Sequence, residues 1–426
     1  STLFPYTTLF RSEYPYSIRV PDFSLPVRTT FPAIYDVRVD GHWIPAGGTR
    51  EEAERAIYKV MADHRTCPSN PVAAPRIDLV DGKLVFDFTE FDAACEVYFG
   101  EFDFPHSYTP WLFYLFGWGH PPADKWGQPP YEGEYPFTDI DRSKLAPGFV
   151  RVYQEALATF WDHLKEKGWA DRFVLYISDE PWMDRVTIQD QMKALCDMIH
   201  EVDASIPIYC STWGHQAAWD GYLDVWGVGQ YGVFSTDEMA KRKAEGDRLR
   251  FTTDGQMCTD TPYLACERLL PWYCFRYGVE AYEFWGADWL TYDPWQFGWH
   301  SFIDQSGEPG ERSWVRYPNG DGFLIYPGWT QGYEAPCSSI RLEAAREGVE
   351  DWLYLQLLAS LVVKADAAGK DAAEGKRLIE EAKALVPIPN AGGRVSTSIL
   401  PDPGAVMQLK QAIADAIEDM QQRLNH

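Results

Sequence analysis

The chain has 426 residues, of which 46% are hydrophobic and 15% aromatic, so it is long enough to bury a large core. Its formal net charge of −25 argues against a nucleic acid or an anionic membrane surface as partner, because both would repel it. The sequence has no apolar run of transmembrane length and no hydrophobic secretory segment, so we expect no membrane insertion.

Four regions follow each other along the chain. Residues 1–12 (STLFPYTTLFRS) have no clear periodicity, and we interpret them as a non-native leader. Residues 13–31 form an N-terminal segment, 32–366 the main domain, and 367–426 a helical extension.

Strand-like and helical patterns alternate through the main domain. The first strand is predicted at Ala33–Val39, and a capping box of Thr49 and Glu52 begins a helix over Glu51–His64. Further strands are predicted near Cys67–Pro75 and at Tyr108–Phe116, Arg172–Ser178, Ile206–Thr212, Leu223–Val228, Leu249–Thr253 and Val279–Phe284. Helices are indicated by apolar stripes at Phe149–Leu164 and Ile188–Val202, by the Ser235 capping box and by Thr261–Tyr277. This order predicts an α/β protein with a (β/α)8 barrel.

Several segments interrupt or follow the alternation. A hairpin is predicted at Ile77–Phe88, and another through Asn319–Gly322. Three C-terminal helices are predicted at Ile340–Ala365, Asp371–Leu385 and Ala405–Leu424.

Two adjacent carboxylates, Asp179 and Glu180, end the apolar fourth strand and are followed by Pro181. The carboxyl ends of barrel strands carry the catalytic groups of such folds, so this pair points to catalysis. The other interpretation is a solvated turn in which Asp179 caps the following helix. The buried character of the preceding run favours catalysis.

Two long aromatic loops, Gly117–Gly148 and Ala287–Pro336, follow predicted strands. The chain has 18 Trp and 24 Tyr, many of them at strand ends or in these loops. Indole faces suit the apolar faces of sugar rings, while acids and amides take the hydroxyls, so we expect a carbohydrate cleft.

Cofactor and metal motifs are not seen in the sequence. The eight cysteines have no metal-ligand spacing, the nine histidines form no HExxH pattern, and no glycine-rich phosphate loop occurs. We therefore predict no metal and no cofactor. The cysteines are interpreted as reduced packing residues, which favours a cytoplasmic location.

Several segments together resemble a known family. Phe173–Pro181 resembles the catalytic segment of glycoside hydrolase family 123. The further matching segments, in the same order, are Tyr277–Gly286 with Trp289, Gly320–Gly328, Ser339–Glu343 and Arg346–Asp351. The set also resembles the domain of unknown function 4091 that accompanies the family. The members of the family are β-N-acetylgalactosaminidases with a (β/α)8 catalytic domain.

The resemblance implies a substrate-assisted, retaining mechanism that releases terminal β-linked N-acetylgalactosamine (GalNAc). The acetamido oxygen of the sugar attacks its own anomeric carbon and forms an oxazolinium ion. Asp179 would orient the acetamide and stabilise its charge, and Glu180 would act as acid and then base. An adjacent Asp-Glu pair suits substrate assistance better than the mechanism of ordinary retaining enzymes, because that mechanism needs two carboxylates about 5–5.5 Å apart across the scissile bond.

Substrate-binding candidates lie at strand exits and in the aromatic loops. They are Trp213, Tyr231, Asp254, Trp285, Asp288, Trp289, Trp111 and Trp118. Members of the family tend to carry Asn at the position of Asp288, which makes Asp288 the residue most able to change the sugar preference. For the aromatic candidates, core packing is the other interpretation. Arg341, Glu343, Glu350 and Asp351 also match the family pattern, and we interpret them as structural ion pairs on the helix that closes the barrel.

Two alternatives remain open at this point. One is another β-glycosidase that uses two separated carboxylates, Glu180 as the acid and Asp254, Glu283 or Asp288 as the nucleophile. The other is a non-catalytic carbohydrate-binding barrel. The residues alone do not choose between the galacto and gluco sugars. They also leave the aglycone and the oligomeric state open.

Overall fold

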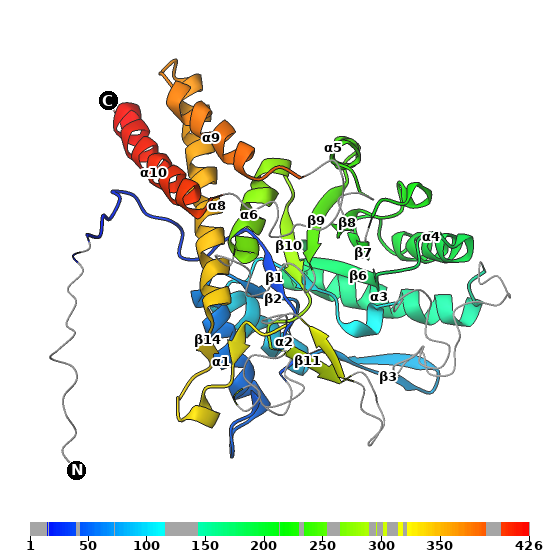
Figure 1. Ribbon diagram of the computed structural model, residues 1–426. Helices are drawn as coiled ribbons and strands as arrows, with labels where there is room; N and C mark the ends of the chain where they lie inside the picture. Colours follow the sequence, from blue (N-terminus) through cyan, green and yellow to red (C-terminus); the bar gives the residue numbers. More distant parts are fainter. Residues whose placement is uncertain are drawn as a thin grey trace, which may run out of the picture.

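Eight parallel strands form the centre of the protein (Figure 1). The computed structural model describes residues 15, 17–39, 43–71, 73–115, 144–212, 214–229, 234–253, 265–288, 295, 301–304, 314–317, 322–388 and 402–425. The eight strands are β1 (Ala33–Tyr35), β2 (Cys67–Pro68), β5 (Ser107–Tyr108), β6 (Phe173–Asp179), β7 (Ile208–Thr212), β8 (Val225–Val228), β9 (Arg248–Thr253) and β10 (Ala281–Phe284). Their order is β2-β1-β10-β9-β8-β7-β6-β5. The Tyr108 N–H donates to the Ser69 carbonyl at 2.7 Å and joins the two edges, so the predicted (β/α)8 barrel is confirmed.

Every predicted barrel strand is found, although the first three are much shorter than predicted. The predicted strand Tyr108–Phe116 ends at Tyr108, because Pro110 cannot donate to a neighbouring strand and begins a short 3-10 turn at Trp111–Phe113. The first strand ends at Tyr35 rather than Val39, and Val39 itself has a left-handed φ of 49°.

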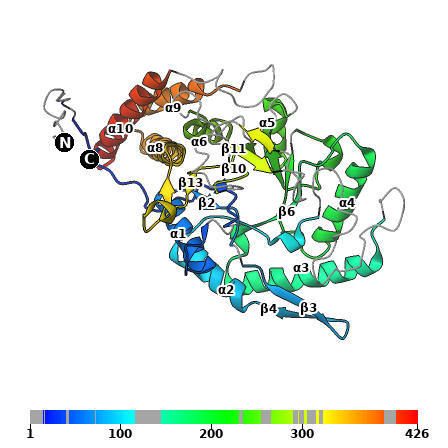
Figure 2. The ribbon, with the colours of Figure 1, turned by 60° about the horizontal axis from the view of Figure 1, so that its bottom comes forward.

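Helices surround the barrel (Figure 2). They are α1 (Arg50–Asp63), α2 (Thr89–Cys95), α3 (Pro147–Lys167), α4 (Val186–His200), α5 (Thr236–Ala244), α6 (Ala265–Tyr277) and α8 (Ile340–Ala367). The capping box of Thr49 and Glu52 is present at the start of α1. Gly168 ends α3 with φ 72°, a conformation that costs glycine little.

Within the described part of the chain, three antiparallel hairpins lie outside the barrel. The predicted hairpin after the second strand is confirmed as β3 (Arg76–Val80) with β4 (Lys83–Asp87). The predicted pairing across Asn319–Gly322 is wrong. Instead, β12 (Trp314–Tyr317) pairs with β11 (Ser301–Asp304), and β13 (Ile325–Tyr326) pairs with β14 (Cys337–Ser338). The turn signal Asn319-Gly320 is local, whereas the choice of partner depends on which strands meet in the fold.

The C-terminal helices α9 (Ala373–Leu385) and α10 (Pro403–Asn425) pack beside α8 (Figure 1). The single helix α8 runs through the predicted boundary at residue 366, and the division of the chain there stays a prediction. The buried carboxylate of Asp351 on α8 accepts from Lys410 of α10 at 2.7 Å and from Arg268 of α6 at 3.0 Å. This carboxylate therefore links the extension to the barrel.

Of the ion pairs predicted for the helix that closes the barrel, those of Glu343, Glu350 and Asp351 are confirmed, and an ion pair of Arg341 stays a prediction. Glu343 pairs with His64 at 3.0 Å, and Glu350 pairs with Arg65 at 3.2 Å. Arg341 is buried and donates to the carbonyl of Phe323 at 2.9 Å. These side chains hold α8 against α1 and the loop before β13. Among the described residues, no helix is long and apolar enough to cross a membrane.

Gly348 allows α8 to approach α6 closely, which leads to a stability prediction. A Cβ at this position would overlap the Arg268 carbonyl oxygen and lie 3.0 Å from the Arg268 Cα. Alanine usually stabilises a helix relative to glycine, but we expect Gly348→Ala to destabilise this protein by about 1–3 kcal/mol, because two backbones must separate. Thermal unfolding measures the effect. Gly100→Ala is the matched control, since its Cβ would lie 3.6 Å from the nearest atom, an oxygen of Glu96. Equal melting temperatures for Gly348→Ala and wild type would contradict the prediction.

Candidate active site

A β-bulge shapes the end of β6. Tyr176 is opposite Tyr209 of β7, but Ser178 is opposite Cys210, so Ile177 is an extra residue in β6. In a regular strand, residues three apart point to opposite faces. Here the Tyr176 hydroxyl donates to the Asp179 carboxylate at 3.1 Å, so the bulge turns Asp179 to the face of Tyr176. This face looks into the barrel, where Tyr176 contacts Tyr108 and Tyr209.

Glu180 leaves the strand in a strained backbone conformation. Its φ is +44°, a left-handed value that costs a non-glycine residue about 1–3 kcal/mol. Its N–H donates to the Ser211 carbonyl at 2.9 Å, which holds this conformation against β7. Strain of this kind is concentrated at functional sites. Asp179 and Glu180 are both half-buried, so their carboxylates remain within reach of a ligand.

Aromatic side chains lie next to Asp179. Trp111 is 56% exposed, and its ring centroid is 4.9 Å from that of Tyr114. Tyr114 in turn packs edge-on against Tyr176 at 5.6 Å. Burial and then the charge of Asp179 raise the pKa of Tyr114, so its hydroxyl stays protonated at neutral pH. The structure thus brings Trp111, one of the predicted sugar contacts, into the aromatic group beside the acid pair.

Trp182 follows the acid pair and was not among the sequence candidates. It is 44% exposed, and the Arg185 guanidinium stacks on its ring at 3.6 Å. The carbonyl of Met183 accepts from the side chains of Gln189 and Gln216, each at 2.8 Å, so this turn is tied to α4 and to the loop after β7. The signal in the sequence was its place two residues after Glu180.

The barrel interior beneath the acid pair contains Glu283, one of the alternative nucleophiles. Glu283 is 8% exposed, and its two oxygens accept from the hydroxyls of Tyr108 and Tyr209. Burial raises the pKa of Glu283, although these hydroxyls act in the opposite direction. The buried Arg250 guanidinium lies 5.5 Å from both tyrosine rings and pairs with Glu280 at 2.8 Å. This layer stabilises the floor of the site.

Asp288 and Trp285 follow the last barrel strand. Asp288 is 1% exposed, and its carboxylate accepts from the N–H groups of Arg38 and Val39 at 2.9 and 2.8 Å. These bonds hold the turn after β1. Trp285 is half-buried and packs closely on Gly322. The role of Asp288 in reading a sugar hydroxyl stays a prediction. The candidates Trp118, Trp213, Tyr231, Asp254 and Trp289 lie outside the described residues.

One group of possible metal ligands occurs among the described residues, at His215, Asp220 and Glu238. His215 lies 2.7 Å from the Asp220 carboxylate. The buried Arg242 guanidinium lies 3.2 Å from Asp220 and 3.1 Å from Glu238, so a cation already neutralises both acids. We therefore interpret the group as an ion-pair network.

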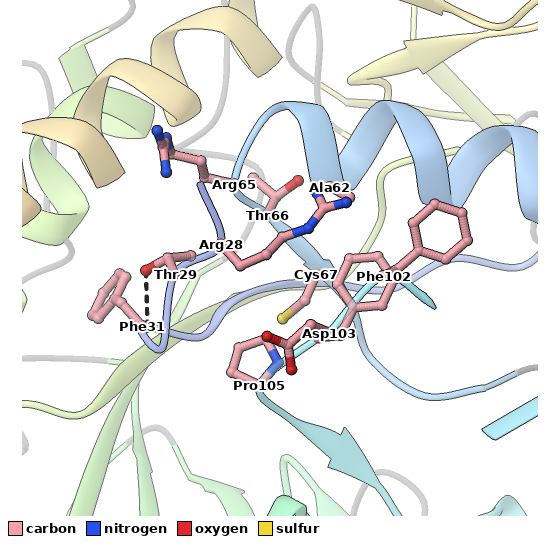
Figure 3. A pocket seen from close by; sticks show the side chains of 11 residues that line it. Arg28, Thr29, Phe31, Ala62, Arg65, Thr66, Cys67, Phe102, Asp103 and Pro105 are labelled. Atoms are coloured by element: carbon pink, nitrogen blue, oxygen red, sulfur yellow. Dashed lines mark hydrogen bonds between the residues drawn. The ribbon is translucent and has the colours of Figure 1, made fainter. Parts of the chain in front are cut away.

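A small cavity lies at the end of the barrel opposite the acid pair. Figure 3 shows the side chains that line it. Its volume is about 10 Å³, which is room for about one water molecule. Phe31, Cys67 and Pro105, which line it, come at or just before the starts of β1, β2 and β5. Catalytic sites of such barrels form at the other ends of the strands, so this cavity belongs to the stabilising face.

Comparisons with known proteins agree with this geometry. A family model described as "Glycoside hydrolase 123, catalytic domain" matches residues 72–358. A solved family 123 glycoside hydrolase from Clostridium perfringens, studied for glycolipid glycan hydrolysis, superposes with a TM-score of 0.58 at 14% identity. That match covers 94% of this chain and 70% of the Clostridium chain.

Weaker structural matches are found as well. An endo-β-1,4-mannanase from Thermotoga petrophila gives a TM-score of 0.42 at 12% identity, over 76% of each chain. An exo-β-1,4-mannosidase from Opitutaceae bacterium strain TAV5 gives 0.38 at 13% identity, over 61% of this chain and 53% of the other. The comparison with curated proteins found no match. The family model covers well over half of the chain, and the acid pair lies at the carboxyl end of a barrel strand inside that range, so this chain belongs to glycoside hydrolase family 123.

Proposed function

We propose that this glycoside hydrolase releases terminal β-linked GalNAc by a substrate-assisted, retaining mechanism. The observation that carries the proposal is the adjacent pair Asp179 and Glu180 at the bulged end of β6. Both side chains are half-buried, and they belong to a chain of family 123. The substrate would be a GalNAc-terminated glycan or glycoconjugate.

Each acid has one role in the proposal. Glu180 gives its proton to the leaving oxygen while the acetamido oxygen of the sugar forms a bond to the anomeric carbon. Asp179 accepts a hydrogen bond from the acetamide N–H and stabilises the positive charge of the oxazolinium ion. Glu180 then takes a proton from water as the water attacks the anomeric carbon. This attack opens the oxazolinium ring, and the anomeric configuration is retained overall.

The described alternative nucleophiles support this assignment over a pair of separated carboxylates. A nucleophile must reach the anomeric carbon, but Glu283 is buried and both of its oxygens accept from tyrosines. The carboxylate of Asp288 is buried as well and holds the backbone of Arg38 and Val39. Asp254 lies outside the described residues, so its role as a nucleophile is tested by substrate kinetics.

Hydrolysis of four aryl glycosides tests the function. We expect turnover of aryl β-GalNAc, weaker turnover of β-GlcNAc, and a rate at least about 100-fold lower for β-Gal and β-Glc, which lack the internal nucleophile. Equal rates on the 2-hydroxy sugars would favour two separated carboxylates, with Asp254→Asn as the next variant. Binding without turnover would favour the non-catalytic carbohydrate-binding barrel.

The choice of GalNAc over GlcNAc gives a separate prediction for Asp288. The two sugars differ only at the C4 hydroxyl, and a polar group placed for one epimer is left unpaired with the other. If Asp288 reads this hydroxyl, directly or through the turn that it holds, Asp288→Ala should reduce the preference for β-GalNAc in kcat/KM. It should also lower the melting temperature, because two backbone N–H groups lose their acceptor. If Asp288→Ala lowers the melting temperature but leaves the sugar preference unchanged, Asp288 has a structural role and does not read the C4 hydroxyl.

A further inference from the structure

We propose that Tyr176 is a positioning residue for Asp179, whose hydroxyl holds one oxygen of the carboxylate so that it stays directed at the acetamide of the bound sugar. The proposal rests on the function proposed above. It concerns a side chain that was not among the candidate site residues and that lies three residues before Asp179.

The contact depends on the bulge in β6. The Tyr176 hydroxyl donates to Oδ1 of Asp179 at 3.1 Å. Without the extra residue Ile177, the two side chains would lie on opposite faces of the strand and could not meet. The Ile177 side chain is completely buried, so it anchors the bulge in the core. The backbone irregularity and the hydrogen bond are therefore parts of one arrangement.

The ring of Tyr176 is fixed on three sides. Its centroid lies 4.8 Å from that of Tyr108, 5.0 Å from Tyr209 and 5.6 Å from Tyr114. Tyr108 and Tyr209 are themselves held through their hydroxyls by the buried Glu283. A donor that is locked in place needs no reorganisation when charge develops at the sugar, which is the condition for an effective electrostatic contribution.

The Tyr176 hydroxyl remains a donor at neutral pH. Burial, followed by the charge of Asp179, raises the pKa of Tyr176 well above its ordinary value. The proton therefore stays on the tyrosine oxygen and points to the carboxylate. A protonated donor restricts rotation of the Asp179 carboxyl group while leaving its negative charge in place.

Tyr176→Phe removes only the hydroxyl oxygen and keeps the ring that packs between its neighbours. We expect kcat on an aryl β-GalNAc to fall by about 10- to 100-fold, because a mispositioned Asp179 stabilises the transition state poorly. KM should change by less than about threefold, since the contact acts through Asp179 on the transition state. Tyr282→Phe is the matched control: it also removes one buried hydroxyl of the barrel, which bonds to Tyr35 at 2.9 Å. It should keep kcat within about twofold of wild type.

A double-mutant cycle with Asp179→Ala separates positioning from a general loss of packing, because alanine removes the acceptor of the Tyr176 hydroxyl. If Tyr176 acts through Asp179, adding Tyr176→Phe to Asp179→Ala should lower kcat by less than about twofold further. If the two effects multiply, Tyr176 acts independently and the proposal is overturned. A kcat of Tyr176→Phe equal to that of wild type would overturn it as well.

A thiazoline mimic of the oxazolinium ion distinguishes failure of this inference from failure of the proposed function. We expect the mimic to inhibit wild type strongly and Tyr176→Phe about 10-fold less. Strong, equal inhibition of both proteins would reject the role of Tyr176 while retaining substrate assistance. No inhibition of wild type would reject substrate assistance itself, and with it the acetamide-directed role of Tyr176.

Discussion

Glu180→Gln is expected to lower kcat/KM on natural GalNAc glycosides by about 10²–10⁴-fold, the usual contribution of a general acid. The amide is close to the carboxylic acid in size but cannot give a proton to the leaving oxygen. An aryl glycoside with a good leaving group needs little protonation, so its first step should be much less affected. Initial rates on the two substrate types measure the difference.

Azide gives a second readout for this variant. In the second step, Glu180 activates water, whereas azide is already a nucleophile and needs no base. Azide should therefore accelerate turnover of the aryl substrate by Glu180→Gln and give the β-glycosyl azide, with retained configuration. Glu166→Gln is the control, because Glu166 is exposed on α3 away from the barrel interior. Wild-type activity of Glu180→Gln on a natural oligosaccharide would show that the acid lies elsewhere.

Asp179→Asn should lower kcat by about 10²–10³-fold with a modest change in KM, which is the signature of a group that acts mainly in the transition state. Asparagine can still accept from the acetamide N–H, but it carries no negative charge to stabilise the oxazolinium ion. The Tyr176 hydroxyl can donate to the amide oxygen as it does to the carboxylate, so the fold should persist. Steady-state kinetics and the melting temperature together measure both expectations.

The thiazoline mimic also tests Asp179. We expect it to bind Asp179→Asn far more weakly than wild type, because its ring imitates the charged intermediate. Similar affinity for both proteins would mean that the carboxylate does not stabilise this charge, and the alternative with two separated carboxylates would gain support.

Much of the architecture follows from local sequence patterns. The apolar run before Asp179 predicts a buried strand, and the Thr49 and Glu52 capping box predicts the start of α1. Such features depend on neighbouring residues, because side-chain period and helix capping act over a few positions. The place of the acid pair at a strand end is part of the same local information, and the family match agrees with it.

The surroundings of the candidate carboxylates are set instead by residues that are distant in the chain. Asp288 looked like an accessible sugar ligand, yet its carboxylate is covered by the backbone of Arg38 and Val39. Glu283 looked like a possible nucleophile, but Tyr108 and Tyr209 enclose it. A carboxylate in a loop has the same local signature whether it binds a ligand or the backbone of another strand.

By itself, the sequence determined the barrel class, the strand that carries Asp179 and Glu180, and the ion pairs expected on α8. Only the tertiary structure decided how the two acids are presented. The bulge at Ile177 and the left-handed φ of Glu180 arise where β6 pairs with β7. Register between strands is set by contacts across the sheet, which no local pattern in β6 encodes. That pairing turns Asp179 towards Tyr176, because the extra residue reverses the face of the sheet to which the following side chains point.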